Sequence, residues 1–216
     1  MTAQLTAVET RILGALIEKE ATTPDTYPLS LNALTNACNQ TSNRDPVMEL
    51  GEDAIRWAVN NLRQHSLVRA IQPSDSRVMK YQHLVAEKLS LDAPSLAVMC
   101  VLMLRGPQTV GEIRGRTSRL AEFSGLDEVD GVIRRLQERE LVAELPRRAG
   151  QKEARYAQLL SGPIEATSHE PDAPTIAPSK QDSTDRIAAL EASVDTLRQE
   201  LSDLRTRFEE FRQQFS

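Results

Sequence analysis

Apolar residues recur at helical spacing in three successive segments near the start of the chain. The first segment begins at Thr6, which can form a capping box with Glu9, and its apolar residues fall on one face of a helix. The second segment begins at Ser30, and the third covers residues 52–64. The pattern therefore predicts three short amphipathic helices.

Two short runs that favour strand structure follow the third predicted helix. They cover residues 67–71 and 78–82 and flank a turn-rich stretch that contains Pro73. Three helices followed by a β-hairpin are the element order of a winged helix, a helix-turn-helix unit with a hairpin appended. We expect this fold for residues 1–85.

The same pattern recurs at constant offsets, which predicts a second copy of the fold in residues 86–162. Leu13 and Leu16 in the first predicted helix correspond to Met99 and Leu102, 86 positions later. The offset is 79 in the second helix and 74 in the third helix and the following strand. It changes only between helices, where surface loops tolerate insertions. The predicted fold class is therefore mainly α with small β-hairpins (α+β), in two tandem winged-helix domains.

The composition changes after residue 162, where prolines and polar residues replace the apolar pattern. Residues 163–184 are predicted to form a flexible linker, because they hold too few apolar residues to build a core. Residues 185–216 then carry apolar side chains at alternating spacings of 3 and 4, the heptad pattern of a coiled coil. The predicted oligomerisation positions are Ile187, Leu190, Val194, Leu197, Leu201, Leu204, Phe208, Phe211 and Phe215.

The core residues of this heptad segment indicate how it would associate. Ile187 and Val194 at a positions, with leucine at d positions, favour a parallel homodimer. The phenylalanines near the end leave trimeric or antiparallel packing open. The alternative without an oligomer is that the amphipathic helix folds back onto its own winged helices.

Composition argues for small helical domains in the cytoplasm. Aromatic residues make up 4% of the chain, so a core would consist mostly of aliphatic side chains. The start of the chain has no basic segment followed by a long apolar run and a cleavage site, and the chain has two cysteines. The longest apolar run, 96–104, is about half of the roughly 20 residues that a transmembrane helix requires. We therefore expect a cytoplasmic protein without a membrane span.

The sequence offers no combination of residues typical of an enzyme site. The three histidines, His65, His83 and His169, have no cysteine or histidine at metal-ligand spacing. Cys38 and Cys100 lie in predicted helices, where a free cysteine usually packs as a small apolar residue. No glycine-rich phosphate loop is present in the sequence. We therefore predict a non-enzymatic protein without metal or cofactor.

The net charge of −5 is concentrated in the tail, because residues 163–216 carry 6 basic and 11 acidic residues. The second predicted domain has basic residues around its second helix and its hairpin, and these are good partners for phosphate groups. They are Arg114, Arg116, Arg119, Arg147, Arg148 and Lys152. Acidic residues at the starts of both third helices oppose base recognition there, although they also stabilise helix N-termini. If DNA binds, we expect mostly phosphate contacts, led by the hairpin and weakened by salt.

The loop after the second helix concentrates amides, hydroxyls and one arginine, and two interpretations remain open. In the structural one, Asn39 and Asn43 turn the chain and Arg44 pairs with a neighbouring carboxylate. Val47 and Met48 then anchor the loop to the core. In the functional one, the loop binds nucleic acid or a partner protein. The candidate contact residues of the whole chain are Asn39, Gln40, Asn43, Arg44, Arg56, Arg114, Arg116, Arg119, Arg147, Arg148 and Lys152.

Several short motifs in both halves of the chain carry a family resemblance. They are Thr22-Thr23-Pro24, Tyr27-Pro28-Leu29-Ser30, Thr35-Asn36-Ala37-Cys38-Asn39-Gln40, Asn43-Arg44-Asp45-Pro46-Val47-Met48, Leu104-Arg105-Gly106-Pro107-Gln108-Thr109, Gly111-Glu112 and Glu122-Phe123. In order and number they resemble the bacterial YceH-like proteins, an uncharacterised family, over essentially the whole chain. The resemblance implies tandem winged helices and a regulator-like role, with no established activity, ligand or DNA site.

The leading hypothesis is a dimeric, nucleic-acid-associated or transcription-regulator-like protein whose winged helices contact the DNA backbone. The alternative is a protein-interaction scaffold, which the near-neutral domains and the acidic third-helix starts suit equally well. A continuous basic surface from the second hairpin to Arg114, Arg116 and Arg119 would favour nucleic acid. A broken one would favour a protein partner.

Overall fold

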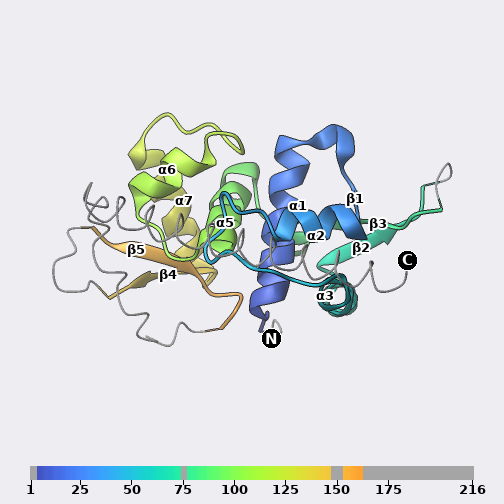
Figure 1. The fold of residues 1–216 in the computed structure, drawn as a ribbon. Helices are drawn as coiled ribbons and strands as arrows, with labels where there is room; N and C mark the ends of the chain where they lie inside the picture. The colour runs from blue at the N-terminus through green and yellow to red at the C-terminus, as the bar shows by residue number, and fades with distance from the viewer. Residues whose placement is uncertain (1–3, 74–76, 147–152, 163–216) are drawn as a thin grey trace, which may run out of the picture. The chain divides into compact units, whose positions relative to one another are not determined.

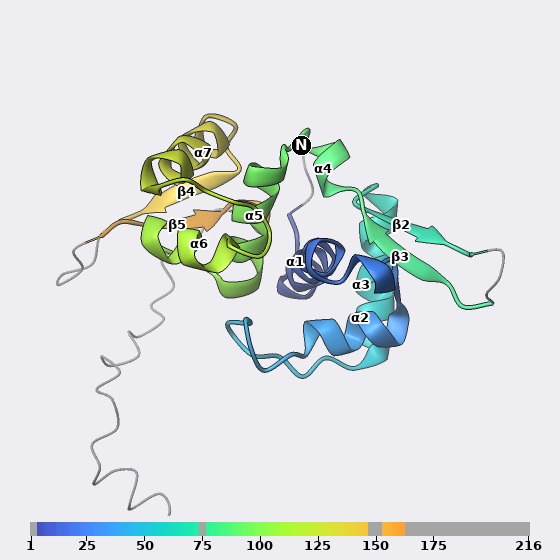
Figure 2. The same cartoon turned by 90° about the horizontal axis from the view of Figure 1, so that it is seen from above.

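The computed structural model describes residues 4–73, 77–146 and 153–162, and two views of it are shown in Figures 1 and 2. This part of the chain is a mixture of α-helices and small antiparallel sheets. The predicted linker and coiled coil lie outside the described residues. No helix in the described part combines the length and the apolar character needed to cross a membrane.

The first repeat has the predicted order of three helices and a hairpin. Its main elements are α1 (Ala7–Thr22), α2 (Leu31–Cys38), α3 (Glu52–Gln64), β2 (Val68–Ile71) and β3 (Lys80–His83). The helix starts follow the predicted caps, because the Thr6 and Glu9 capping box is present and the Ser30 hydroxyl accepts from the Ala33 amide. The returning strand begins two residues later than predicted.

Three smaller elements, two in the first repeat and one at the junction of the repeats, were not expected from the sequence. They are η1 (Pro24–Thr26), β1 (Leu29–Ser30) and α4 (Val85–Lys88). β1 pairs antiparallel with β3, so the sheet has the order β1-β3-β2 rather than being a simple hairpin. A two-residue strand is too short to leave a periodic signal in the sequence.

The second repeat copies the first with the displacements seen in the sequence pattern. Its elements are α5 (Ala93–Arg105), α6 (Val110–Thr117), α7 (Leu126–Glu138), β4 (Val142–Leu145) and β5 (Arg155–Gln158). The starts of the three helices lie 86, 79 and 74 positions after those of α1, α2 and α3. The repeat is therefore present in the observed elements as well as in the apolar pattern.

An isolated bridge in the second repeat takes the place of β1. Gln108 pairs with Tyr156, and the equivalent pair in the first repeat is Leu29 with Tyr81. The Gln108 amide donates to the Tyr156 carbonyl at 3.0 Å, and the Tyr156 amide donates back at 2.8 Å. In each repeat, the residues just before the second helix thus form backbone hydrogen bonds to the returning strand of the hairpin at equivalent positions.

The two repeats share one continuous hydrophobic core, and α1 and α5 lie side by side at its centre (Figures 1 and 2). At their crossing, the Cys100 thiol contacts the Gly14 carbonyl oxygen at 3.4 Å. Gly14 and Cys100 are equivalent positions of the repeat, 86 residues apart, so the first helices pack through corresponding faces. Burial raises the pKa of the Cys38 thiol to about 12 and that of Cys100 well above its usual range.

Candidate functional site

The second helix of the second repeat, α6, carries the group of arginines that the sequence singled out. Its start is fixed by a capping box, in which Thr109 and Glu112 bond each other's amides at 3.2 and 2.9 Å. Ile113 and Thr117 face the core. The helix therefore has one buried side, and its arginines are left on the other.

Most of the positive charge around α6 is not neutralised by nearby carboxylates. Glu112 bonds mainly to Arg155, with oxygen to nitrogen distances of 3.0 and 3.4 Å, and lies 3.8 Å from Arg116. Arg114 and Arg119 are exposed and have no ion pair within the described part of the chain. Their charges are available to an anion from solution.

The polar loop, residues 39–51, follows the second helix of the first repeat and is held in place by Arg44. The Arg44 side chain is fully buried, and both terminal nitrogens bond to the Glu18 carboxylate, at 3.1 and 2.6 Å. Arg44 also donates to the Ala37 carbonyl from Nε and Nη2. Arg44 is therefore a structural anchor and not an exposed contact residue, because its guanidinium is already occupied inside the protein.

A second buried arginine supports the same segment from α1. Arg11 donates to the Cys38 carbonyl at 3.1 Å and to the Pro46 carbonyl at 2.5 Å. Together with Arg44 it satisfies carbonyl groups at the C-terminal end of α2, where backbone acceptors lack helical partners and cations are favoured. Burial and the nearby Arg44 lower the pKa of Arg11.

The two asparagines of the polar loop stabilise its conformation, as the structural interpretation expects. The Asn39 side chain bonds both the amide and the carbonyl of Leu50, at 2.8 and 2.9 Å, and so closes the loop. Asn43 adopts a left-handed conformation with φ of 60°. The prediction that Val47 anchors the loop is wrong, because this side chain is 53% exposed. Leu50 packs against the core in its place.

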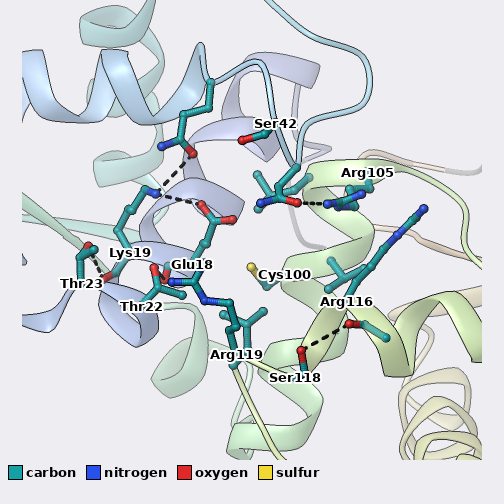
Figure 3. Close-up of a pocket in the computed structure, with 16 residues that line it drawn as sticks. Glu18, Lys19, Thr22, Thr23, Ser42, Cys100, Arg105, Arg116, Ser118 and Arg119 are labelled. Carbon is teal, nitrogen blue, oxygen red and sulfur yellow. Dashed lines mark hydrogen bonds and ion pairs between the residues drawn. The ribbon is translucent and has the colours of Figure 1, made fainter.

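The polar loop borders a pocket of about 370 Å³ between the ends of α1 and α5 and the helix α6 (Figure 3). Its lining is mostly polar and contains four cationic side chains: Lys19, Arg105, Arg116 and Arg119. Neutral hydrogen-bonding groups complete the wall, among them Thr22, Gln40, Ser42, Asn43 and Ser118. In Figure 3, Lys19 lies on one side of the pocket and Arg105 and Arg116 on the other.

Two of the pocket cations are oriented by the polar loop. Lys19 donates to the Gln40 side-chain oxygen at 3.3 Å and lies 3.3 Å from Glu18. Arg105 donates to the Asn43 side-chain oxygen. Burial, followed by the positive charges of Arg116 and Arg44, lowers the pKa of Arg105. The pocket lining thus carries a net positive charge, since its four cations outnumber its single carboxylate, Glu18.

The structure brings together predicted residues from distant parts of the sequence. Gln40, Asn43, Arg116 and Arg119 line the same pocket, and Arg114 borders a neighbouring hollow beside α6. Asn39 and Arg44 support the loop from within. Arg56 is exposed on α3 and pairs with Glu52 at 2.6 Å. Arg147, Arg148 and Lys152 lie outside the described residues.

Lys19 and Arg105 were missed by sequence reasoning, although the repeat contained a signal for them. They are equivalent positions, 86 residues apart, in the last turns of α1 and α5. A cation there stabilises the end of a helix, which is a sufficient reason for either residue alone. Their convergence on one pocket depends on the packing of α1 against α5, which no local pattern reveals.

Two glutamates, the buried Glu9 and the partly buried Glu18, link the site to the pH dependence of stability. Burial alone would raise the pKa of Glu18, but its bonds and charge interaction with Arg44 outweigh burial and lower it. Glu9 is similar, since bonds from Thr6 and Asn61 overcome the effect of burial. A carboxyl group with a lowered pKa in the folded state stabilises the protein above the unfolded pKa of about 4.3. That contribution is lost as the pH falls through the folded-state value.

We therefore expect Glu18→Gln to reduce the free energy of unfolding most at neutral pH. Below a pH of about 4.3 the difference from wild type should shrink, because the unfolded wild-type chain then binds a proton at Glu18 and the folded chain follows once the pH falls through its lowered pKa. Urea unfolding between pH 7 and pH 3 measures both curves. Glu49→Gln, an exposed change in the polar loop, is the control and should run parallel to wild type. A Glu18→Gln difference that stays constant with pH would contradict the account.

The third helix of the first repeat presents a different kind of surface. Trp57 is 67% exposed on α3, which is unusual for the chain's single tryptophan. Glu52 and Asp53 occupy the first turn of the same helix. This face is therefore aromatic and acidic, in contrast to the arginine-rich face of α6.

Comparisons with known proteins place the chain among bacterial proteins without a stated activity. The sequence pattern of a family described as "Protein of unknown function, DUF480" matches residues 5–151. A UPF0502 protein of Solibacter usitatus is 50% identical over 212 residues, which cover 98% of each chain. A UPF0502 protein of Pelobacter propionicus is 50% identical over 215 residues, again 98% of each. One from Vibrio vulnificus is 45% identical over 214 residues, 95% of this chain and 97% of the relative.

Proposed function

Since this chain belongs to the DUF480 family, whose relatives are named UPF0502 proteins, we propose its function from the site: it binds nucleic acid through phosphate contacts. The membership confirms the expectation of an uncharacterised bacterial family, while the name YceH-like is not confirmed. The role is that of a nucleic-acid-associated, regulator-like protein without enzymatic activity.

The proposal treats each repeat as a winged helix, so that α6 and α7 form a helix-turn-helix pair. Support comes from the order of three helices and a hairpin in both repeats. In helix-turn-helix proteins the first helix of the pair crosses the sugar-phosphate backbone and the second enters the major groove. α6 would therefore lie where phosphate groups pass.

The single observation that carries the proposal is the contrast between α6 and its counterpart in the first repeat. α6 carries Arg114 and Arg116, and Arg119 lies two residues after its end. α2 occupies the equivalent position and has no acidic residue in its first turn and no basic residue in its last. Its sequence, residues 31–38, contains no charged side chain at all. Only the second repeat is therefore equipped to bind phosphate through this helix.

The start of α7 argues that the contacts are to the backbone and not to bases. Asp127 and Glu128 stand in its first turn, where base-reading side chains would lie. Carboxylates there stabilise the helix N-terminus and repel phosphate. Arg134 is exposed further along the helix and has no ion pair in the described part of the chain. Binding would consequently be strong at low salt and only weakly dependent on DNA sequence.

The proposal also includes pairing of two chains through the heptad segment, residues 185–216. Two linked cationic faces bind a polyanion more tightly than one, because the second contact becomes intramolecular. Arg147, Arg148 and Lys152, which the sequence suggests as phosphate partners, would add further contacts to the backbone.

The test measures the affinity of the full-length chain for a short labelled duplex by fluorescence anisotropy. Arg114→Gln combined with Arg134→Gln should weaken binding by on the order of tenfold or more at low salt, because two phosphate contacts are lost. Arg56→Gln is the matched control, an exposed helical arginine of the first repeat whose charge is already paired with Glu52. It should stay within about twofold of wild type. Equal affinities for all three proteins would refute the proposal.

One observation favours the alternative of a protein-interaction scaffold. Exposed tryptophans are typical of binding hot spots between proteins, and Trp57 stands on α3 with acidic neighbours. Tryptophan fluorescence of the protein, recorded while the duplex is added, separates the two functions. Trp57 is the only tryptophan, so its emission reports on α3. Unchanged emission on addition of the duplex is expected if the second repeat binds. No duplex binding even at low salt would favour the scaffold.

A further inference from the structure

The pocket between α1, α5 and α6 has features that backbone binding by α6 does not require. Lys19 and Arg105 belong to the first helices of the two repeats, and Arg116 and Arg119 come from the α6 region. Four cations, one from α1 and three from residues 105–119, therefore line one partly open pocket. A surface that only follows the backbone of a duplex would not need to be hollow.

The carboxylate nearest the pocket does not neutralise this charge. Glu18 lines the pocket, but both of its oxygens bond to the buried Arg44, at 3.1 and 2.6 Å. Its remaining interaction is with Lys19 at 3.3 Å. Arg105 and Arg119 have no ion pair within the described part of the chain. The lining of the pocket thus holds four cations and one carboxylate, whose charge is already shared with Arg44. Outside the lining, Glu112 lies 3.8 Å from Arg116 and Asp45 interacts electrostatically with Arg105.

We propose that this pocket binds a small anion carrying a phosphate group, either orthophosphate or a small phosphate ester. Guanidinium groups match phosphate oxygens in charge and in hydrogen-bond geometry, and Lys19 adds a compact charge. The hydroxyl of Ser42 lies in the same lining and can donate to a remaining phosphate oxygen, whereas those of Thr22 and Ser118 donate to the carbonyls of Glu18 and Gly115. A volume of about 370 Å³ is at the small end of ligand pockets.

The polar loop supplies the preorganisation that such a site needs. Gln40 and Asn43 accept hydrogen bonds from Lys19 and Arg105 and so orient them before a ligand arrives. Arg44 in turn fixes the loop. The structural and functional interpretations of the loop are therefore compatible, since Arg44 holds the segment and its neighbours position the ligand-binding cations.

The helix-end explanation does not account for the whole cluster. Lys19 and Arg105 stand at helix C-termini, where cations are favoured. However, the Lys19 and Arg105 side chains bond to side chains of the polar loop and to Glu18, and within the described part of the chain neither donates to a carbonyl of its own helix. Arg105 is partly buried next to Arg116, and burial together with the charges of Arg116 and Arg44 lowers its pKa in spite of the attraction of Glu18 and Asp45, so a bound anion would add a further favourable interaction.

The experiment is isothermal titration calorimetry of the full-length chain with inorganic phosphate and with glycerol phosphate, at an ionic strength held constant with chloride. Saturable binding is expected. Lys19→Gln combined with Arg105→Gln should weaken it at least tenfold. Arg119→Gln changes an exposed side chain, so it should weaken phosphate binding severalfold without changing the melting temperature. It replaces the double variant as the test if the double variant does not fold. Arg134→Gln lies outside the pocket and should leave it unchanged.

The outcomes are separate from those that test nucleic-acid binding, because no duplex is present. Absence of saturable binding to both probes, or equal binding by wild type and Arg119→Gln, would overturn the inference. The duplex affinity of Lys19→Gln should stay within twofold of wild type. A loss as large as that of the variant with Arg114→Gln and Arg134→Gln would show that the pocket accepts backbone phosphate, and would also overturn the inference.

Discussion

Arg44→Met is expected to lower the free energy of unfolding by about 3–5 kcal/mol, the range measured when one partner of a buried ion pair is removed. Methionine keeps most of the apolar volume of the side chain but loses the charge. Glu18 would then be left without its bidentate partner, and the Ala37 carbonyl would lose both of its bonds from the guanidinium. Urea unfolding at pH 7 measures the loss.

Arg56→Met is the control for this substitution. Arg56 also forms an ion pair at 2.6 Å, with Glu52, but the two side chains are 54% and 47% exposed. An exposed pair one helical turn apart contributes only about 0.3–0.5 kcal/mol, so the control should lose no more than that. Equal losses in the two variants would show that the buried network around Arg44 does not hold the polar loop.

Gly14→Ala is expected to destabilise the protein by about 1–3 kcal/mol, the usual effect of adding a methyl group to a packed core. A Cβ at this position would lie 2.8 Å from Leu104 Cδ2 and Cγ and 3.1 Å from Met103 Cβ. Leu104 and Met103 are buried in α5, so they have little room to move. The added methyl would push α1 away from α5 at the centre of the shared core. Thermal and urea unfolding both report the effect.

Gly131→Ala is the matched control, because Gly131 is also inside a helix but has nothing within 4 Å of an added Cβ. Alanine favours the helix over glycine by about 0.5–1 kcal/mol, so this variant should be more stable than wild type. If Gly14→Ala lowers the free energy of unfolding and Gly131→Ala raises it, the tight packing lies at the crossing of α1 and α5. A stabilising Gly14→Ala would contradict the observed crossing.

The sequence was informative about the fold wherever burial is periodic. The offsets of 86, 79 and 74 between apolar positions reappear as displacements of the helix starts, because each helix buries one face in the core. β1 was missed, since two residues carry no period. Its position could still be inferred after the fact, because Leu29 and Gln108 are equivalent positions that pair with equivalent tyrosines.

The site was only partly predictable, because its parts come from distant segments. The arginines of α6 could be identified from residue type and helix position. The partner of Arg44 could not, because Glu18 is 26 residues away and reaches it only through the packing of α1 against the polar loop. The net charge also gave no indication of an anion site. The charges of residues 86–162 sum to nearly zero, but the fold places several of the cations around one pocket.

The most direct test of phosphate binding by the second repeat is the dependence of duplex affinity on salt. A plot of the logarithm of the association constant against that of the salt concentration has a slope of about −0.9 for each phosphate neutralised. We predict a steep negative slope for the full-length chain, and one that is shallower by about 2 for the variant with Arg114→Gln and Arg134→Gln. Identical slopes for the two proteins, or binding that does not change with salt, would contradict the account.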